Sequence, residues 1–393
     1  MLVPLSNTPR DYAWGSTTLI ADLEGRDPAD GPEAEVWFGD HPGSPARVED
    51  GTGRTLDRWL AEEGEGLHVA TRLPYLLKLL AAAHPLSIQA HPSKAQAEAG
   101  FAREEAAGIP RDAVERNYRD DNHKPELIVA VSDTFRALAG LRDIAATRRL
   151  LAALPDGAGV RALRERLDAS DPARALAETV PWLLSPEAAP VVTDVLAALG
   201  QAHADEFAAE LDLARRLLGE VPQDPGIVVA LLMNLVTLQR GEGLFVPAGV
   251  LHAYFDGLGV ELMAASDNVL RGGFTPKHID VAELAAVLDA TPGAVPVVRP
   301  APVAGATGDV EAYPVPVADF ELVRVRVRPD APAAFALRGT AIALGTAGEV
   351  EIGQGTETLP MRPGQAVLIT PSAELVRVRG DGEVFIAQPG PAS

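Results

Sequence analysis

The chain contains no cysteine among its 393 residues. This absence excludes disulfide bonds, thiolate zinc sites, iron–sulfur clusters and cysteine nucleophiles. A metal in this protein must therefore be bound by imidazole, carboxylate or amide oxygen. Long apolar runs are lacking too, since the two longest, 73–86 and 227–238, are too short or too interrupted to span a bilayer. The first residues show no signal-peptide pattern. We expect a cytoplasmic protein that does not bind a membrane.

Positive charge is scarce in this sequence. The chain has 55 Asp and Glu residues against 34 Lys and Arg residues, which gives a formal net charge of −21. A field of this sign argues against nucleic acid or an anionic membrane as a partner. It also repels anionic substrates at long range, so any phosphate site must be a local cluster of cations.

Lysine is the rarest basic residue. Only four lysines occur: Lys78, Lys94, Lys124 and Lys277. Arginine fills the general surface roles, so the remaining lysines are expected where a compact, titratable ammonium is needed and a guanidinium cannot replace it. Chance survival of four lysines is the alternative. Each of them lies inside or beside a motif described below, which favours function.

Three compositional zones divide the chain. Residues 1–142 combine short apolar runs with Gly and Pro turns, a β-rich pattern. Residues 143–235 carry apolar residues at helical spacing. The β pattern resumes at about 236, and the proline-rich stretch 292–302 is typical of a linker. We predict a first β domain of 1–142 plus 236–300, a helical insert domain of 143–235 and a C-terminal β-barrel domain of 301–393.

The two β zones share a weak internal similarity. The segment 243–252 resembles the segment 364–376, and aligning Pro247 with Pro371 puts Val376 where His252 stands. Two related β-barrels, only the first with a metal ligand, would explain this similarity. A chance match between two strand-turn segments is an equal alternative.

Two segments of the first zone hold candidate metal ligands. Gln89 and His91 are two residues apart, so on a strand they would face the same side. Alone, this pair is a weak signal, and a hydrogen-bonded histidine would explain it better. Glu126 follows Pro125 at the start of an apolar run, where burying its charge requires a counterion. A metal would balance this charge, and an ion pair with Lys124 is the alternative.

The third segment, Val246-Pro-Ala-Gly-Val-Leu-His252, holds the candidate ligand His252. A turn formed by Pro and Gly, followed by a strand that presents a histidine, resembles the second signature of cupin barrels, where the histidine binds a metal. Chance placement of one of the eight histidines is the alternative. Two imidazole nitrogens, an amide oxygen and a carboxylate would suit zinc, with manganese, iron or cobalt as alternatives.

A fourth segment, 266–277, contributes Asp267 and Arg271. Two glycines follow Arg271, so its guanidinium could reach a ligand across bare backbone. An ordinary ion pair between Asp267 and Arg271, four residues apart, is the alternative.

With Asp11-Tyr-Ala-Trp-Gly15, Glu35-Val-Trp-Phe-Gly39 and the segment 76–80, these four segments resemble the type I phosphomannose isomerases of the cupin superfamily. The resemblance is strong over 1–142 and 236–280, where the motifs occur in the family's order. The helical zone and the C-terminal β zone match the family only in their type of structure. It implies a mainly β fold with helices: a cupin-type (jelly-roll) β-barrel catalytic domain, an inserted α-helical domain and a smaller C-terminal β-barrel.

The resemblance also implies a site and a reaction. One zinc ion per chain would be bound by Gln89, His91, Glu126 and His252. Further residues are implied to line the active site: Lys78, His123, Lys124, Asp267 and Arg271. The protein would be an intramolecular aldose–ketose isomerase of mannose metabolism, interconverting D-mannose 6-phosphate and D-fructose 6-phosphate through an enediolate.

Roles within that site are predicted as follows. Lys124 and Arg271 supply positive charge near the reacting carbons. Asp267 is the first choice for the base and His123 the second, with a metal-bound hydroxide as the alternative. The predicted phosphate-binding residues are Ser87, Lys94 and Lys78, with Lys277 as a further candidate.

Two other functions are weighed against this one. A cupin metalloenzyme of the dioxygenase class would require iron and usually a histidine-rich triad, which Gln89 argues against. A non-catalytic bicupin that binds a sugar would not need Lys124, Asp267 and Arg271 together. The expected partner is a small phosphosugar, and the expected assembly is a monomer or a weak homo-oligomer.

Overall fold

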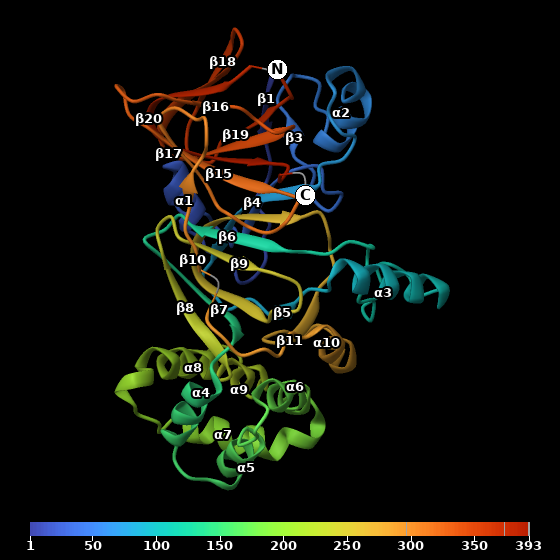
Figure 1. The fold of residues 1–393 in the computed structure, drawn as a ribbon, viewed down its shortest axis with the longest axis vertical. Helices are drawn as coiled ribbons and strands as arrows, with labels where there is room; N and C mark the ends of the chain where they lie inside the picture. Colours follow the sequence, from blue (N-terminus) through green and yellow to red (C-terminus); the bar gives the residue numbers. More distant parts are fainter. Residues whose placement is uncertain (296, 373, 392–393) are drawn as a thin grey trace.

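The computed structural model describes residues 1–295, 297–372 and 374–391. Two groups of antiparallel strands are stacked along the long axis of the molecule, and a group of helices lies at the end away from the N-terminus (Figure 1). The middle group of strands carries the predicted metal ligands. We call it the central β module, and the strand group that contains both the N-terminal strand and the last strand is the terminal β module.

Strand β10 (His252–Ala264) joins the two layers of the central β module. A register irregularity between Tyr254 and Asp256 is followed by Gly257 at φ 121°, where an added Cβ would lie 2.8 Å from the Thr134 carbonyl oxygen. Only glycine fits this bend. Before the bend β10 pairs with β5 and β7, and after it with β4 and β6. The other strands are β2 (Glu35–Phe38), β4 (Tyr75–Ala82), β5 (Ile88–Ala90), β6 (Glu126–Ala130), β7 (Thr134–Leu141), β8 (Met233–Gln239), β9 (Gly243–Val246), β11 (Leu270–Gly273) and β12 (Val297–Val298).

The two layers enclose an apolar interior. Leu80, Ile128 and Leu244 from one layer and Val236 and Tyr254 from the other belong to one buried cluster. The predicted mainly β fold with helices is confirmed. The strands form no closed hydrogen-bonded ring within the described ranges, so the predicted barrel is a pair of facing layers that share β10.

The terminal β module is a second sheet of ten antiparallel strands. Its N-terminal strand pairs with a strand near the other end of the chain, with Leu2 opposite Ile369. The sequence analysis did not predict this pairing, and the predicted domain boundaries stay a prediction. The strands are β1 (Leu2–Ser6), β3 (Arg47–Val48), β13 (Ala301–Pro302), β14 (Asp309–Ala312), β15 (Glu321–Val327), β16 (Ala333–Phe335), β17 (Ala341–Gln354), β18 (Glu357–Met361), β19 (Ala366–Ile369) and β20 (Val376–Gln388).

The internal similarity reappears in these strands. His252 begins β10 and Val376 begins β20, and both strands are 13 residues long. Each follows a four-residue strand, β9 or β19, and a connection whose sequence contains proline, Pro247 or Pro371. The aligned segments therefore occupy corresponding places in the two β modules. The predicted linker 292–302, by contrast, includes the short strand β12 and all of β13, which extend the central and terminal sheets respectively.

The two β modules share one buried core. Leu127 and Phe245 of the central module pack in the same cluster as Phe320, Leu344 and Phe385 of the terminal module. Burial of each such side chain stabilises the fold by about 1.5–3 kcal/mol. This shared core holds the terminal β module rigidly against the strands that carry the site.

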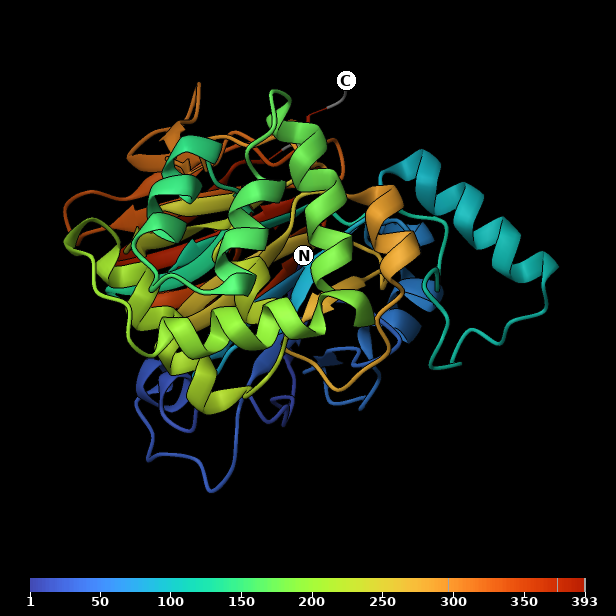
Figure 2. The same ribbon diagram turned by 90° about the horizontal axis from the view of Figure 1, so that it is seen from below.

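The helical group covers the far end of the central β module (Figure 2). Asp143 and Asp171 cap the first and third helices by accepting the N–H groups of Ala146 and Arg174. The helices and short 3-10 turns are α4 (Ile144–Ala152), α5 (Ala158–Arg166), α6 (Pro172–Leu183), η2 (Pro186–Ala188), α7 (Ala189–Leu199), η3 (Asp205–Phe207), α8 (Ala208–Glu220) and α9 (Gly226–Ala230). The predicted helical zone thus holds helices, although β8 begins inside it.

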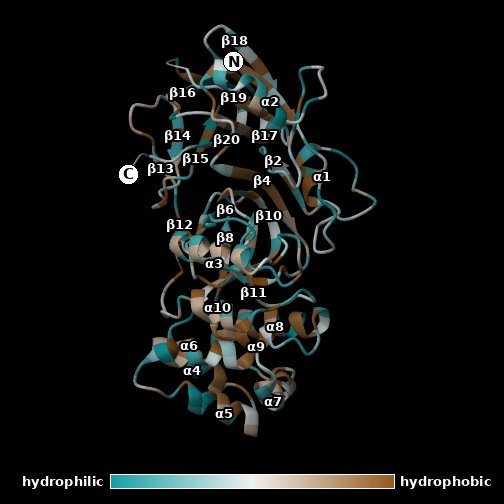
Figure 3. Ribbon diagram, turned by 90° about the vertical axis from the view of Figure 1, so that its right-hand side faces the viewer, coloured by the Kyte–Doolittle hydropathy of each residue, from teal (hydrophilic) through white to brown (hydrophobic). Residues whose placement is uncertain are grey.

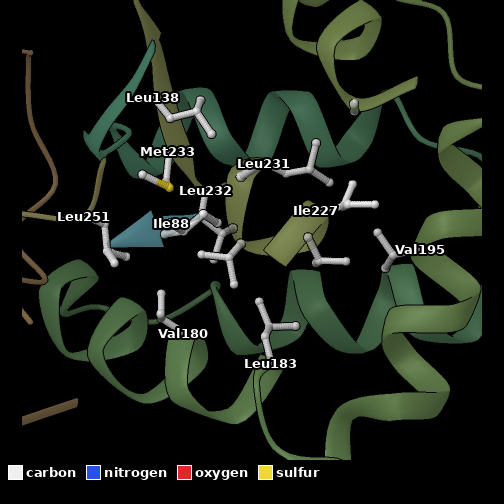
Figure 4. Packing of buried hydrophobic residues seen from close by; sticks show 14 of the residues in the cluster. Ile88, Leu138, Val180, Leu183, Val195, Ile227, Leu231, Leu232, Met233 and Leu251 are labelled. Carbon is white, nitrogen blue, oxygen red and sulfur yellow. The ribbon is translucent and has the colours of Figure 1, made fainter. Parts of the chain in front are cut away.

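The helices bury the back of the strand that carries Gln89. Ile88 of β5 and Leu251 lie beside Val180 and Leu183 of α6, and Ile227 of α9 extends the same cluster (Figure 4). Hydrophobic residues gather inside the helical group around α9 (Figure 3). Because side chains alternate along a strand, Ile88 faces this core and its neighbour Gln89 faces the other way.

The remaining helices lie at the edges of the molecule. α3 is closed at its start by a capping box between Ser93 and Gln96 and projects from the body (Figure 1). In the described part of the chain no single helix has the length and apolar composition to cross a membrane, and one bent pair, α6 with η2–α7 at 88°, passes by length and composition only. These helices are α1 (Leu19–Glu24), α2 (Leu56–Glu63), η1 (Glu65–Leu67), α3 (Lys94–Ala106) and α10 (Val281–Val287).

Candidate metal centre and active site

Three of the four predicted metal ligands converge. Ligand atoms of His91, Glu126 and His252 all lie within 4.8 Å of one another, and all three side chains are buried. Glu126 begins β6, His252 begins β10 and His91 directly follows β5. Glu126 Oε1 lies 3.1 Å from His91 Nε2, and its Oε2 lies 3.3 Å from His252 Nε2. One carboxylate therefore lies between two imidazole rings.

Backbone carbonyl groups orient both rings. His91 Nδ1 is 2.8 Å from the carbonyl oxygen of Asn268, and His252 Nδ1 is 3.2 Å from that of Val250. A carbonyl only accepts, so each Nδ1 carries the proton and a neutral ring keeps a lone pair on Nε2. Burial, together with the charge of Lys124, lowers the pKa of His91 to about 4. This ring is therefore neutral at physiological pH, and its lone pair points at Glu126.

This arrangement fits a divalent metal. His91 Nε2 is buried and has no hydrogen-bond partner among the described residues. A buried acceptor without a partner is rare, and two lone pairs beside a carboxylate repel one another unless a cation lies between them. Imidazole nitrogen and carboxylate oxygen are common zinc ligands.

Gln89 is placed beside this centre by strand register. Its Cα is paired with that of His252 on one side and that of Arg271 on the other. Gln89 Nε2 donates to Ser87 Oγ at 2.9 Å, which commits the amide nitrogen and leaves the amide oxygen for a ligand. Gln89 is therefore suited to be a neutral fourth ligand.

Lys124 contacts the same carboxylate as the histidines. Its Nζ is 2.9 Å from Glu126 Oε1. Burial raises the pKa of Glu126, but the positive charge of Lys124 outweighs burial, so this pKa lies well below its usual value. The ion pair proposed as an alternative to a metal is thus present, and the unpaired His91 Nε2 shows that it does not satisfy the whole cluster.

A second buried cluster surrounds Lys78 on the same inner face. Lys78 Nζ lies 2.9 Å from Glu261 Oε2 and 3.8 Å from Glu35 Oε2, and Trp37 Nε1 donates to Glu35 at 2.5 Å. Burial opposes the charge, but Glu261 and Glu35 raise the pKa of Lys78 above its usual value. Sequence analysis missed Glu261, although an acidic residue inside the apolar run of β10 is a detectable signal.

Asp267 is paired with a histidine that the sequence analysis did not select. His41 Nε2 lies 3.2 Å from Asp267 Oδ2, and Asp267 is 45% exposed. Partial burial raises the pKa of Asp267, but the hydrogen bond from His41 and the charges of His41, Lys124 and Arg119 bring it below its usual value. The alternative of an ion pair between Asp267 and Arg271 is wrong, because Arg271 forms no ion pair within the described residues and lies on β11.

The side chains of His123 and Lys94 each have polar contacts in the structure. His123 Nε2 lies 2.9 Å from Oδ2 of Asp319, which belongs to the segment before β15 of the terminal β module. Lys94 is exposed, donates to the carbonyl oxygen of Asp121 at 2.8 Å and lies 3.6 Å from Glu98. Its ammonium group therefore already has partners on the surface.

Three cations without a counterion gather beside the metal centre. Arg119, Arg271 and Lys277 form no ion pair in the part of the chain that the structure describes. Burial lowers the pKa of Arg271 and of Lys277; Arg119 lowers both further, and Arg271 adds to the effect on Lys277. Such mutual influence requires proximity. A phosphate would relieve this repulsion.

Hydrogen bonds hold the loop of residues 119–122 against the loop of residues 266–268. The fully buried Asn268 donates to the carbonyl oxygens of Asp120 and Asn122 at 2.8 and 2.9 Å, and its Oδ1 accepts the N–H of Arg119 at 2.7 Å. Ser266 Oγ donates to Asp120 Oδ1 at 2.8 Å. These bonds place the loop that carries Lys124 against the loop that carries Asp267.

Comparisons with known proteins show the family to which the chain belongs. Residues 2–144 match the family model described as phosphomannose isomerase type I, catalytic domain. The mannose-6-phosphate isomerase of Escherichia coli is 38% identical, and that of Salmonella typhimurium is 36% identical, each over 97% of this chain and 97% of the relative. A crystal structure of the Salmonella typhimurium enzyme, described as bound to substrate (f6p) and zinc, has a TM-score of 0.86 at 32% identity and covers 99% of this chain and 100% of its own.

Proposed function

The chain belongs to the type I phosphomannose isomerases, and on that basis we propose that it uses one zinc ion to interconvert D-mannose 6-phosphate and D-fructose 6-phosphate through an enediolate. The observation that carries the zinc proposal is the buried, unpartnered Nε2 of His91, which faces Glu126 and lies beside His252. We propose these three residues and Gln89 as the ligands.

The reaction moves a proton from C2 to C1 and a second proton from the C2 hydroxyl to the C1 oxygen. Its enediolate places negative charge on both oxygens, so the site must hold positive charge close to them. Zinc, when bound, would supply Lewis acidity and orientation for these oxygens. Lys124, 2.9 Å from Glu126, and Arg271, beside Gln89 in register, are placed to add positive charge at the same position.

The structure changes our ranking of the bases. A lowered pKa makes Asp267 a weaker base, and its carboxylate is already paired with His41. Imidazole is the side chain that exchanges protons most readily near neutral pH. We therefore propose that His123 carries the proton between the carbons, while Asp267 and His41 contact the sugar hydroxyl groups.

The phosphate is proposed to bind at Arg119, Arg271 and Lys277. These cations lack a counterion within the described ranges, whereas Lys78 is held by Glu261 and Lys94 by Asp121 and Glu98. Ser87 stays a candidate, because its hydroxyl oxygen accepts a bond from Gln89 and its own proton is left to donate. The proposed phosphate site thus differs from the predicted one in its cations.

A coupled assay tests this function. Purified protein should convert mannose 6-phosphate to fructose 6-phosphate, lose that activity after exhaustive chelation and regain it when zinc is returned. Activity that survives complete removal of the metal would contradict the zinc requirement. A protein that contains iron and consumes oxygen without isomerising the sugar would instead support the dioxygenase alternative.

Three further predictions concern the setting of the reaction. We propose a cytoplasmic location and a small-molecule phosphosugar as the partner, without nucleic acid or membrane. A monomer or weak homo-oligomer is the assembly we expect.

A further inference from the structure

A hydrogen bond between His123 and Asp319 connects the central and terminal β modules. His123 lies on the loop before β6, and Asp319 lies just before β15, 196 residues further along the chain. The ring Nε2 and the carboxylate Oδ2 are 2.9 Å apart. The two side chains are partly exposed, at 26% and 20% respectively. Solvent can therefore reach the ring.

The backbone on the Asp319 side is rigid. The next residue, Phe320, is fully buried in the core shared by the modules. The preceding carbonyl, of Ala318, accepts the N–H of Gly390 at 3.1 Å. Earlier in the same segment, the buried Tyr313 donates its hydroxyl to the carbonyl oxygen of Gly241 at 2.8 Å. Asp319 is therefore presented from a segment that is anchored on both sides.

The backbone on the His123 side is equally constrained. The carbonyl oxygen of Asn122 accepts bonds from Ser266 and Asn268, and Lys124 is held by Glu126. These contacts hold the main chain but leave the imidazole free to rotate. Within the described residues, Asp319 is the one hydrogen-bond partner of the ring.

We propose that Asp319 is a positioning residue that acts through His123. Its carboxylate accepts the Nε2–H of the ring, so the Nδ1 lone pair is directed to the substrate, and its charge stabilises the imidazolium that forms when His123 takes the proton. The terminal β module thereby completes the active site. This inference rests on the proposed function, because it assigns Asp319 a part in the same proton transfer.

A purely structural role is the competing explanation. The shared apolar core already joins the modules, so one partly exposed hydrogen bond is not needed to dock them. A structural role would change the stability of the protein and would act independently of His123. A positioning role would change kcat and would disappear once His123 is removed.

The test measures kcat and KM for mannose 6-phosphate in the zinc-loaded enzyme. We expect Asp319→Ala to lower kcat by roughly 10- to 100-fold with little change in KM, as when an orienting partner of a functional histidine is lost. Asp319→Asn keeps an acceptor of nearly the same shape but no charge. Its kcat should lie between those of the wild type and Asp319→Ala. In a His123→Ala background, Asp319→Ala should cause no further loss.

Glu321→Gln is the matched control. Glu321 lies two residues from Asp319, is similarly buried at 14% exposure, and pairs with Arg338 at 3.1 Å. Its variant should keep the wild-type kcat. Three outcomes overturn the inference: an unchanged kcat in both Asp319 variants, a change confined to KM, or an equal loss in the presence and absence of His123. Wild-type protein that does not isomerise mannose 6-phosphate would instead reject the proposed function, so the two failures are distinguishable.

Discussion

Glu126 Oε1 and His91 Nε2 lie 3.1 Å apart, although neither atom carries a hydrogen. The carboxylate is ionised, and the neutral His91 ring has its proton on Nδ1. The contact is therefore not a hydrogen bond, and its repulsion is removed only by a cation. Metal binding and folding are coupled at this point, because the same atoms that bind the metal repel each other without it.

Replacing His91 by alanine should remove bound zinc and lower kcat at least about 100-fold, because one ligand and one oriented lone pair are lost. Zinc per chain and activity are measured on the same sample. His84→Ala is the control, since His84 is 60% exposed, contacts Glu220 of α8 at 3.0 Å and is not part of the metal-binding cluster. Full zinc occupancy in His91→Ala would show that the ligand set is misassigned.

The stability of the metal-free protein should depend on pH through His91. Its pKa falls from 6.5 in the unfolded chain to about 4 in the folded protein, so the unfolded chain binds more protons between these values. The sign follows: the stabilisation is complete above the unfolded pKa and is lost as pH falls toward about 4. The full loss amounts to about 3 kcal/mol.

Urea unfolding in the presence of a chelator, across that pH window, measures this effect. His91→Gln lacks the titrating ring, so its free energy of unfolding should change less between the two ends of the window. Equal slopes for wild type and His91→Gln would contradict the assignment. Zinc-loaded wild type serves as a reference, because zinc would occupy the Nε2 lone pair of His91 and compete with its protonation.

Two of the proposed ligands, Glu126 and His252, could be predicted at strand starts because each follows a local turn pattern. Pro125 precedes the strand that begins at Glu126, and the Pro247–Gly249 turn precedes the strand that begins at His252. Gly249 has φ 80°, and an added Cβ there would lie 2.7 Å from the Val287 carbonyl oxygen, so this turn needs glycine. Such signals lie within a few residues of the functional side chain.

Other parts of the site depend on contacts that no local pattern encodes. Asp319 meets His123 only because β15 packs onto a core shared with β6, and His41 reaches Asp267 from a separate loop. Glu261 is opposite Lys78 in the register of β10 and β4. Long-range register of this kind depends on the whole sheet. The same reason explains why the pairing of β1 with β19 was not predicted.

The phosphate site can be tested with two lysines. Lys277→Ala should raise KM for mannose 6-phosphate by about tenfold, because an unpaired cation near Arg119 and Arg271 is removed. Lys94→Ala should change KM little, because the ammonium group of Lys94 is already bound to Asp121 and Glu98. Inhibition by inorganic phosphate, measured in both variants, separates phosphate binding from sugar binding.

A larger increase of KM in Lys94→Ala than in Lys277→Ala would instead support the predicted phosphate site at Lys94. An equal increase of KM for free mannose in Lys277→Ala would also contradict a phosphate role. Arg119→Ala provides a second measurement of the same cluster, since its guanidinium is exposed and its loss should not disturb folding.

The buried pair of Lys78 and Glu261 should be needed for stability as a pair. Lys78→Met leaves Glu261, which is 3% exposed and near Glu35 and Glu126, without its cation. Removing one partner of a buried ion pair costs about 3–5 kcal/mol. The free energy of unfolding in urea should therefore fall by this amount, whereas Lys78→Met combined with Glu261→Gln should recover much of it, because no uncompensated charge is left.

The pH dependence of this variant distinguishes charge from packing. Burial already raises the pKa of Glu261, with Glu126 and Glu35 adding to the effect, and without Lys78 this pKa must rise further. A carboxyl group with a raised pKa binds its proton in the folded protein first, so stability is present at low pH and is lost as pH rises through the folded pKa. Lys78→Met should therefore approach wild type at about pH 5 and differ most at about pH 8. A deficit that is constant over this range would mean that lost packing of the lysine stem, and not the unpaired carboxylate, destabilises the variant.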